Sequence, residues 1–176
     1  MTDSIGLRRG TVKVVEYSPN WPKDFEAEKQ RLIDAFGDKI LTIEHIGSTS
    51  VPGLAAKPII DMIAAVKSFD DLPEFVNRLQ KLGYEYMPER MFNNRKFFPK
   101  GSQENRTHHL SLVLLGDPEQ WIKPIAFRDY LRIHETERDE YANLKTTLAN
   151  RYANDRATYT QLKDDFFRLI FGKALS

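Results

Sequence analysis

The chain has 176 residues, of which 41% are hydrophobic and 29% charged. That length allows one sizeable core and is short for two, so we expect a single domain. The 26 basic residues nearly balance the 25 acidic ones, and a net charge of +1 shows no global signature of a nucleic-acid or membrane protein. The absence of cysteine excludes disulfides and thiolate zinc sites. No apolar run approaches the ~20 residues of a membrane span, and residues 1–10 lack a signal-peptide core, so we expect a cytoplasmic protein.

The first segment in chain order is polar. We expect residues 1–11 to form a flexible arm, followed by a single domain over residues 12–176. Alternation of Val12, Val14 and Tyr17 with polar residues predicts a short edge strand, which a proline-containing turn ends. A helix then begins near Asn20, and Gly37 stops it. Its apolar face consists of Phe25, Leu32, Ile33 and Phe36.

Residues 41–66 predict two strands joined by a turn of small residues. The second apolar run, from residue 59, is interrupted by one carboxylate, Asp61. A desolvated, unpaired carboxylate costs on the order of several kcal/mol, so Asp61 must be paired, hydrogen-bonded or metal-bound. The preceding turn offers amides and hydroxyls to an anion, and Lys57 adds a positive charge. We therefore expect a phosphate chain and a divalent metal here, with phosphate-binding residues Gly47, Ser48, Thr49, Ser50 and Lys57.

A second helix is predicted between Asp70 and Gly83, because its apolar residues repeat at helical spacing. It returns the chain across the sheet, which favours a mixed α/β sheet with a helix against one face. Residues 84–87 are a candidate for a further strand.

Residues 88–107 mix basic and aromatic side chains. This mixture is found on nucleotide-binding surfaces. The alternative is a hairpin, in which residues 95–98 pair with the strand after Arg106 and the charges are solvated. The two interpretations are compatible, with Arg95, Lys96 and Arg106 at the rim of the central site.

Residues 108–115 predict a third strong strand, with His108 on one face and His109 and Ser111 on the other. A strand histidine is commonly a hydrogen-bonded core or edge residue; the alternative is a metal ligand. His109 and His45 are both candidates for the second role. Glu44 lies on the face opposite to His45.

Beyond Gly116 the pattern is helical, with a start at residues 117–119, a restart at Pro124 and two more amphipathic helices. Arg128 and Arg132 are four residues apart and share a helix face, where they can reach a triphosphate or a carboxylate. The alternative is an ordinary surface with ion pairs.

Four long sequence words resemble the GrpB family. They are IEHIGSTSVPGLAAKPIIDM at residues 43–62, VVEYSPNWPKDFEAEKQRL at 14–32, RTHHLSLV at 106–113 and FRDYLRIHETERDEYANLKTTLANRYANDRATY at 127–159. The resemblance implies a nucleotidyltransferase-like fold of the α/β (α+β) class, a mixed β-sheet flanked by helices with a C-terminal helical segment. Similar domains are fused to some dephospho-coenzyme A kinases. The resemblance implies no established reaction.

In the nucleotidyltransferase superfamily, a Gly-Ser pair follows the first core strand and a D-x-D pair lies on the second. The resemblance places Gly47 and Ser48 at the first motif and Asp61, as the catalytic acid, at the start of the second. Ile63 stands where the second acid is expected, and Ser111 is a further departure on the later strand. A Mg²⁺ ion would then be held by Asp61, Glu44 and His109.

Three hypotheses follow. The first is a magnesium-dependent enzyme that transfers a nucleotidyl group. The second is a non-catalytic ligand-binding or accessory module related to the kinase-fused domains. The third is a transition-metal site made of His45, His109 and Asp61. We expect a nucleotide or another phosphorylated small molecule as partner, and neither a membrane nor a nucleic acid.

Overall fold

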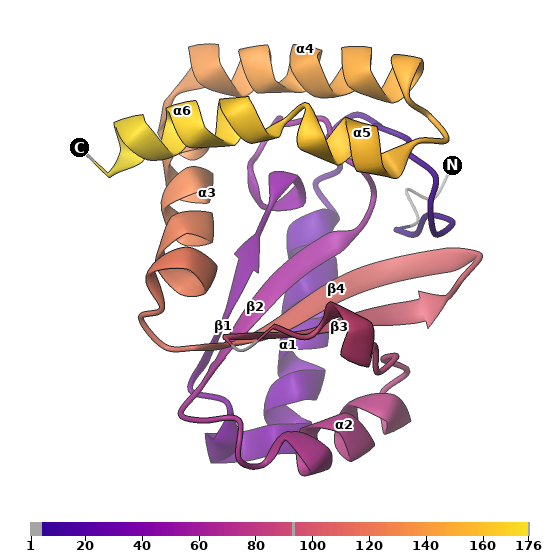
Figure 1. The fold of residues 1–176 in the computed structure, drawn as a ribbon, viewed down its shortest axis with the longest axis vertical. Helices are drawn as coiled ribbons and strands as arrows, with labels where there is room; N and C mark the ends of the chain where they lie inside the picture. The colour runs from indigo at the N-terminus through magenta and orange to yellow at the C-terminus, as the bar shows by residue number, and fades with distance from the viewer. Residues whose placement is uncertain (1–4, 93, 176) are drawn as a thin grey trace.

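The computed structural model describes residues 5–92 and 94–175, and Figure 1 shows a four-stranded sheet with helices on both sides. The strands are β1 (Thr42–Ile46), β2 (Ile60–Val66), β3 (Arg95–Ser102) and β4 (Asn105–Leu114). The helices are α1 (Trp21–Phe36), α2 (Leu72–Lys81), α3 (Lys123–Ile133), α4 (Glu135–Arg151), α5 (Arg156–Gln161) and α6 (Asp164–Ala174). The predicted fold class, a mixed sheet flanked by helices with a C-terminal helical segment, is confirmed.

The strand order is β1-β2-β4-β3, and only the central pair, β2 and β4, is parallel. A parallel pair needs a crossover connection, which α2, the loop after it and the edge strand β3 supply. The predicted hairpin is present as β3 and β4, with its turn at Gln103 and Glu104, slightly later than expected. The two strands that carry Asp61 and His109 are therefore neighbours at the centre of the sheet.

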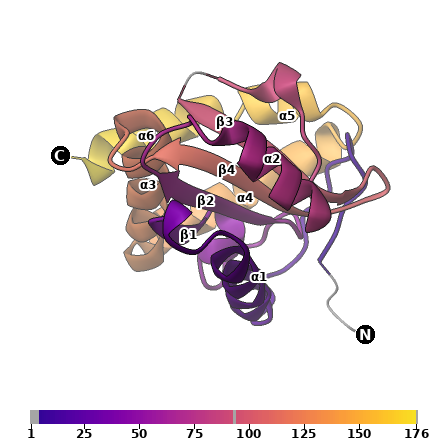
Figure 2. The ribbon, with the colours of Figure 1, turned by 90° about the horizontal axis from the view of Figure 1, so that it is seen from below.

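One face of the sheet carries the larger apolar core. Alternation along the strands places Ile43, Met62 and Leu110 on this face, where they pack against α1 and α2. Figure 2 shows these two helices in front of the sheet and the C-terminal helices behind it. Polar side chains on the opposite face are thus separated from this core by the full thickness of the sheet.

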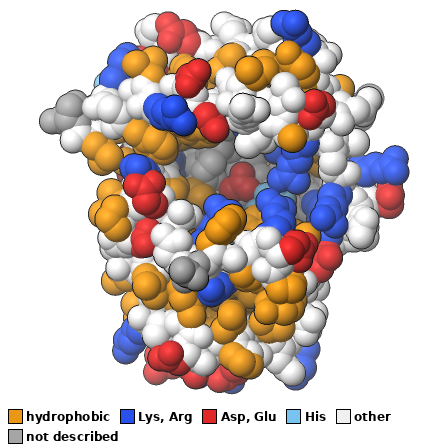
Figure 3. Space-filling model, viewed as in Figure 1, with side chains coloured by type: hydrophobic (Ala, Val, Ile, Leu, Met, Phe, Trp, Pro, Cys, Tyr) orange, Lys and Arg blue, Asp and Glu red, His pale blue; other side chains and the backbone are white. Residues whose placement is uncertain are grey.

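The opposite face is covered only in part. Helices α3, α4 and α6 share a second core, in which Phe127 and Tyr141 pack against the loop residues Val51 and Leu54. The space-filling view in Figure 3 shows a hollow between this helical layer and the sheet, with a carboxylate within it and Lys and Arg side chains along one side. The candidate site lies in this hollow.

The N-terminal segment differs from the expectation. From residue 5 it lies along the sheet, since Gly6 N donates to Pro58 O at 2.7 Å and Arg9 N donates to Gln103 O at 2.7 Å. Residues 1–4 of the expected arm lie outside the described residues. The predicted edge strand at residues 12–17 is reduced to one bridge, Val15 with Ala56, because its neighbour is a loop.

Smaller differences concern helix ends and residues 84–87. The second helix follows Asp71 and not Asp70, and neither Asn20 nor Asp71 makes a side-chain cap hydrogen bond. Tyr84 makes only an isolated bridge with Lys100. No helix in the described part of the chain is both long and apolar enough to cross a bilayer.

Candidate functional site

The site begins where the turn after β1 meets the start of β2. The antiparallel register pairs Ile46 with Asp61, so Gly47 lies directly against the Asp61 side chain. Gly47 has φ +70°, and a Cβ at this position would lie 2.8 Å from Asp61 Oδ2. Glycine is required here on both counts, since other residues rarely adopt this φ and the approach leaves no room for a side chain.

Asp61 is hydrogen-bonded to His109 across the parallel strands. The two residues are register partners, and His109 Nδ1 donates to Asp61 Oδ1 over 2.9 Å. Burial raises the pKa of Asp61, but the hydrogen bond and electrostatic interaction with His109 and the charge of Lys57 outweigh it, so the pKa is lowered overall. The Asp61 side chain is 40% exposed and its carboxylate is ionised at neutral pH.

On one side of Asp61 lies a basic cavity of about 120 Å³, which we call the lysine lobe. Lys57 precedes β2, Lys145 comes from α4 and Lys163 lies between α5 and α6. Lys145 lies 4.6 Å from the ring centroid of Tyr141, and Lys163 lies 4.4 Å from that of Tyr159. Gly47, Ser48 and Asp61 line the same cavity, and the ammonium group of Lys145 donates to the carbonyl oxygen of Ala55.

Burial and neighbouring positive charges disfavour the charged form of these three lysines. Burial lowers the pKa of Lys145 well below its ordinary value, and the charges of Lys163 and Lys57 lower it further. Burial and the charge of Lys57 lower the pKa of Lys163 to about 8, although Asp61 acts in the opposite direction. Clustered, desolvated cations of this kind are typical of anion-binding sites.

On the other side of Asp61 lies a cavity of about 270 Å³, which we call the aromatic lobe. Gly47, Asp61, Phe127 and Phe167 line both lobes, so the two lobes meet at Asp61. The other residues that line the aromatic lobe are Ile46, Met62, Arg95, Phe97, His109, Ser111, Pro124 and Phe171. The whole cleft therefore has a cationic end, an apolar end and one carboxylate between them.

Within the turn, only part of the predicted phosphate-binding set faces the cleft. Ser48 lines the lysine lobe and is hydrogen-bonded to Tyr141. Thr49 also lines it, but its hydroxyl is buried between His45 Nε2, at 2.9 Å, and the carbonyl of Ile59. The Ser50 hydroxyl donates to Gly47 O at 2.5 Å. The hydroxyls of Thr49 and Ser50 thus hold the turn together and are not free for a ligand.

The predicted metal set is assembled only in part. Asp61 and His109 are in contact. Glu44 lies two residues before Ile46, the register partner of Asp61 on β1, and its carboxylate accepts a hydrogen bond from Arg128 Nη1 at 2.6 Å. Among the described residues, no group of three or more His, Asp or Glu side chains is arranged to hold a metal ion. The three-ligand arrangement of Asp61, Glu44 and His109 is therefore corrected to Asp61 with His109.

His45 and Lys96 are not at the rim of the cleft, because strand alternation turns them to the other face of the sheet. His45 is buried and stacks on Phe25 with ring centroids 4.7 Å apart, and burial lowers its pKa to about 4. Lys96 donates to Phe92 O at 2.7 Å. A transition-metal site of His45, His109 and Asp61 is excluded by this placement.

Of the four remaining predicted rim residues, one lines the cleft and three do not. Arg95 lines the aromatic lobe, and its Nε is buried without a hydrogen-bond partner. Arg106 is buried and bridges Glu85 and the carbonyl of Gly101, so it fixes the hairpin. Arg128 pairs with Glu44, and Arg132 donates to Ser50 O at 2.9 Å. These two arginines border a separate cavity at the β1 edge that does not include Asp61.

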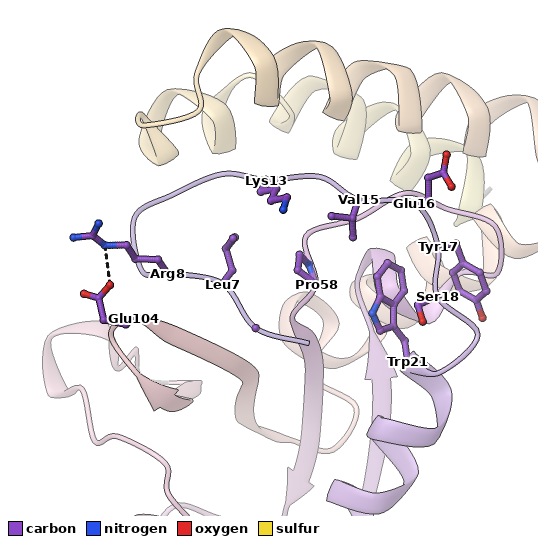
Figure 4. A pocket seen from close by; sticks show the side chains of 11 residues that line it. Leu7, Arg8, Lys13, Val15, Glu16, Tyr17, Ser18, Trp21, Pro58 and Glu104 are labelled. Carbon is purple, nitrogen blue, oxygen red and sulfur yellow. Dashed lines mark ion pairs between the residues drawn. The ribbon is translucent and has the colours of Figure 1, made fainter. Parts of the chain in front are cut away.

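A larger cavity, about 490 Å³, lies elsewhere, beneath the N-terminal segment (Figure 4). Its lining includes Trp21, which is almost fully buried, and Arg8 and Glu104, which pair at 3.2 Å with both side chains mostly exposed. Neither Asp61 nor the three lysines of the lysine lobe border this cavity. Its size alone does not make it the candidate site.

The comparisons with known proteins agree on the family. The family model described as GrpB protein matches residues 11–173. Glutamate-rich protein GrpB of Alkalihalophilus pseudofirmus is 36% identical over 165 residues, which cover 92% of this chain and 95% of that protein. Protein YqkA of Bacillus subtilis is 39% identical over 89% of this chain, which spans only 45% of YqkA. A dephospho-CoA kinase of Mycolicibacterium paratuberculosis is 26% identical over 96% of this chain and 47% of the kinase.

Solved structures extend the likeness to a wider fold. The crystal structure of GrpB from Enterococcus faecalis has a TM-score of 0.86 and 37% identity, and the match covers 93% of this chain and 97% of that one. The Cid1 poly(U) polymerase bound to Mg 3′-dATP has a TM-score of 0.58 at 12% identity, over 84% of this chain and 49% of Cid1. The second likeness shows a shared nucleotidyltransferase fold and nothing about the reaction.

Proposed function

Because this chain belongs to the GrpB family and has the nucleotidyltransferase fold, we propose that it binds a nucleoside triphosphate, or a similar phosphorylated ligand, in the cleft at Asp61. The phosphates occupy the lysine lobe and the base occupies the aromatic lobe. The two lobes have volumes of about 120 and 270 Å³. Taken together, they lie at the lower end of the range for small-molecule sites, roughly 300–1,000 Å³.

The observation that carries this proposal is the cluster of Lys57, Lys145 and Lys163 opposite the Gly47–Ser48 turn. Burial and neighbouring positive charges lower the pKa values of all three lysines, and one carboxylate, Asp61, lines the same cavity. Bringing these cations together costs folding free energy unless an anion joins them. A triphosphate supplies the missing negative charge.

The aromatic lobe supports the placement of the base. Phe97, Phe127 and Phe171 line it, and flat apolar walls suit a purine or pyrimidine ring. Arg95 adds a cation whose Nε has no partner in the described structure. Since every base has a π-face, this lobe favours nucleotides as a class without selecting one base.

A divalent metal fits only as part of the bound ligand. Asp61 is ionised and half-exposed at the junction of the two lobes, but a single carboxylate holds Mg²⁺ weakly. Ile63 and Ser111 supply no further acid. We propose that Mg²⁺ enters with the triphosphate and is shared between Asp61 and phosphate oxygens, where it would neutralise negative charge on the phosphates.

Calorimetric titration with ATP tests the proposal. We expect wild type to bind ATP more tightly with Mg²⁺ than without, and Lys145→Met/Lys163→Met to weaken binding at least tenfold. Asp61→Asn should abolish the benefit of Mg²⁺ while retaining metal-free binding. Lys81→Met, an exposed lysine on α2, is the matched control and should bind as wild type. Absence of ATP binding at millimolar concentration would refute the proposal.

The second candidate is a binding module without catalysis, and the missing acids favour it. Nucleotidyl transfer requires an acceptor oxygen to attack the α-phosphorus while the α–β phosphate bond breaks and pyrophosphate leaves. With Mg²⁺-ATP and candidate acceptors, the enzyme hypothesis predicts pyrophosphate release that Asp61→Asn abolishes. The module hypothesis predicts binding with no pyrophosphate, and the kinase relatives suggest dephospho-coenzyme A as another ligand to titrate.

A further inference from the structure

A second group of cations adjoins the cleft, apart from the three lysines. Arg9 comes from the N-terminal segment, Arg90 from the turn before β3 and Arg156 from the start of α5. We call these three residues the arginine cluster. Arg9 and Arg156 line a small cavity of about 10 Å³ together with Lys57 and His109. Figure 3 shows Lys and Arg side chains gathered along one side of the hollow.

The arginine cluster differs from the neighbouring arginines in its ion pairs. In the part of the chain that the structure describes, no carboxylate lies within ion-pair distance of Arg9, Arg90 or Arg156. Neighbouring arginines differ in this respect, since Arg8 pairs with Glu104 and Arg106 pairs with Glu85. The cluster is therefore not part of the ordinary surface pattern of ion pairs.

The charges of the cluster are close enough to affect one another. Burial lowers the pKa of Arg90, and the charges of Arg156, Arg95 and Arg9 lower it further. The guanidinium of Arg90 lies 4.2 Å from the ring centroid of Phe97, which holds it over an aromatic face. Glu89 acts on Arg90 in the opposite direction, but the three like charges prevail, and a guanidinium held in this way over a ring is suited to an anion.

The cluster is next to the site and separate from the lysine lobe. Lys57 lines both the lysine lobe and the small cavity, and His109 lines both the aromatic lobe and the small cavity. His109 in turn donates to Asp61. A ligand on the arginines would thus lie next to His109, the hydrogen-bond partner of Asp61, and would leave Lys145 and Lys163 available.

We propose that the arginine cluster binds the phosphate group of a second, small substrate, which accompanies the nucleotide in the cleft. The assignment of this molecule as the second substrate rests on the proposed function. The planar guanidinium groups match phosphate oxygens in pairs. The net charge of +1 gives no chain-wide positive field for a polynucleotide, so a small phosphorylated molecule is the better match. Because the present cavity holds about one water, Arg9, which is exposed, must rotate outward to admit the phosphate.

The test titrates inorganic phosphate, and then ribose 5-phosphate, into the ATP-free protein and into protein saturated with Mg²⁺-ATP, with calorimetric detection. We expect binding in both states. Arg9→Gln/Arg156→Gln should weaken it at least tenfold and change ATP affinity less than threefold. Arg168→Gln, which removes a mostly exposed arginine on α6, is the control and should have no effect.

The lysine variant separates this inference from the proposed function. Lys145→Met/Lys163→Met should lose ATP binding and keep the phosphate response of the ATP-free protein. If ATP does not bind while phosphate binding depends on the arginines, the nucleotide proposal fails and the phosphate site stands. Phosphate binding that the arginine substitutions leave unchanged, or no phosphate binding, overturns the inference. A 5′-phosphorylated hexanucleotide that binds a hundredfold more tightly than phosphate overturns the choice of a small substrate.

Discussion

Replacing Lys163 by methionine is expected to stabilise the protein without its ligand. Burial, followed by the charge of Lys57, lowers the pKa of Lys163 from 10.5 to about 8. Since one pKa unit corresponds to about 1.4 kcal/mol, the charged side chain destabilises the fold by at most about 3.5 kcal/mol. The side chain is partly exposed and able to relax, so we expect a gain of about 1–2 kcal/mol in the free energy of unfolding at pH 7.

The pH dependence gives this prediction a definite sign. Below pH 8 the lysine is protonated in both the folded and the unfolded state, and wild type bears the full cost. Between pH 8 and 10.5 the unfolded state binds more protons, so the stability of wild type rises relative to the variant. The difference between the two proteins should therefore shrink through this range and disappear above it.

Urea unfolding at pH 7 and pH 10, followed by circular dichroism, measures both effects. Comparison of two variants at each pH cancels the titration of the other groups. Lys81→Met, at an exposed position, is the control and should match wild type within about 0.5 kcal/mol. Two results would refute the account of a repulsive lysine cluster. Lys163→Met could be less stable than wild type at pH 7, or the difference in free energy of unfolding between the two proteins could be the same at pH 7 and pH 10.

Three further predictions concern the turn, the core and the carboxylate. Gly47→Ala should lower the free energy of unfolding by about 1–3 kcal/mol, because its Cβ would meet Asp61 and its φ is +70°; urea titration measures the loss. Glu28→Gln should cost about 2–4 kcal/mol by breaking a buried ion pair with a lysine. Burial raises the pKa of Glu28, but hydrogen bonds lower it overall, so its contribution is present above pH 4.5 and falls as the medium is acidified below that. His109→Leu should raise the pKa of Asp61, measured by carbon NMR of its carboxyl group.

Each of these has a control and a contrary result. Gly116→Ala shares the positive φ, +78°, but meets nothing within 4 Å, so equal losses at the two glycines would contradict the contact with Asp61. Glu26→Gln on the exposed side of α1 should be neutral, and an equal loss there would remove the argument for the buried pair. An unchanged Asp61 titration in His109→Leu would show that the hydrogen bond does not set its ionisation.

Sequence reasoning located Asp61 because a charge inside an apolar strand requires a partner. The partner, His109, follows from strand alternation once β2 and β4 are neighbours. The same logic applies to Lys145 and Lys163, which the site prediction missed. Lys145 is four residues after Tyr141 on the apolar face of α4, and Lys163 is four residues after Tyr159. A cation on an apolar helix face was the available signal for Lys145, whereas Lys163 lies in the short segment between α5 and α6.

Other parts of the site could not be read from the sequence. Glu44 lies on the predicted strand and face, but its ion pair with Arg128 depends on how α3 packs against β1. The Ser50 hydroxyl is a good anion donor by type, yet the 3₁₀ turn directs it to Gly47 O. The arginine cluster joins three segments distant in sequence, so only the tertiary fold brings it together.

The most direct test of the central claim is a crystal structure of the protein soaked with ATP and MgCl₂. The account predicts phosphate density within hydrogen-bonding distance of Lys57, Lys145 and Lys163, with a metal ion between the phosphates and Asp61. Phosphates bound instead at the β1-edge cavity beside Arg132, or an empty cleft at saturating ATP, would contradict it.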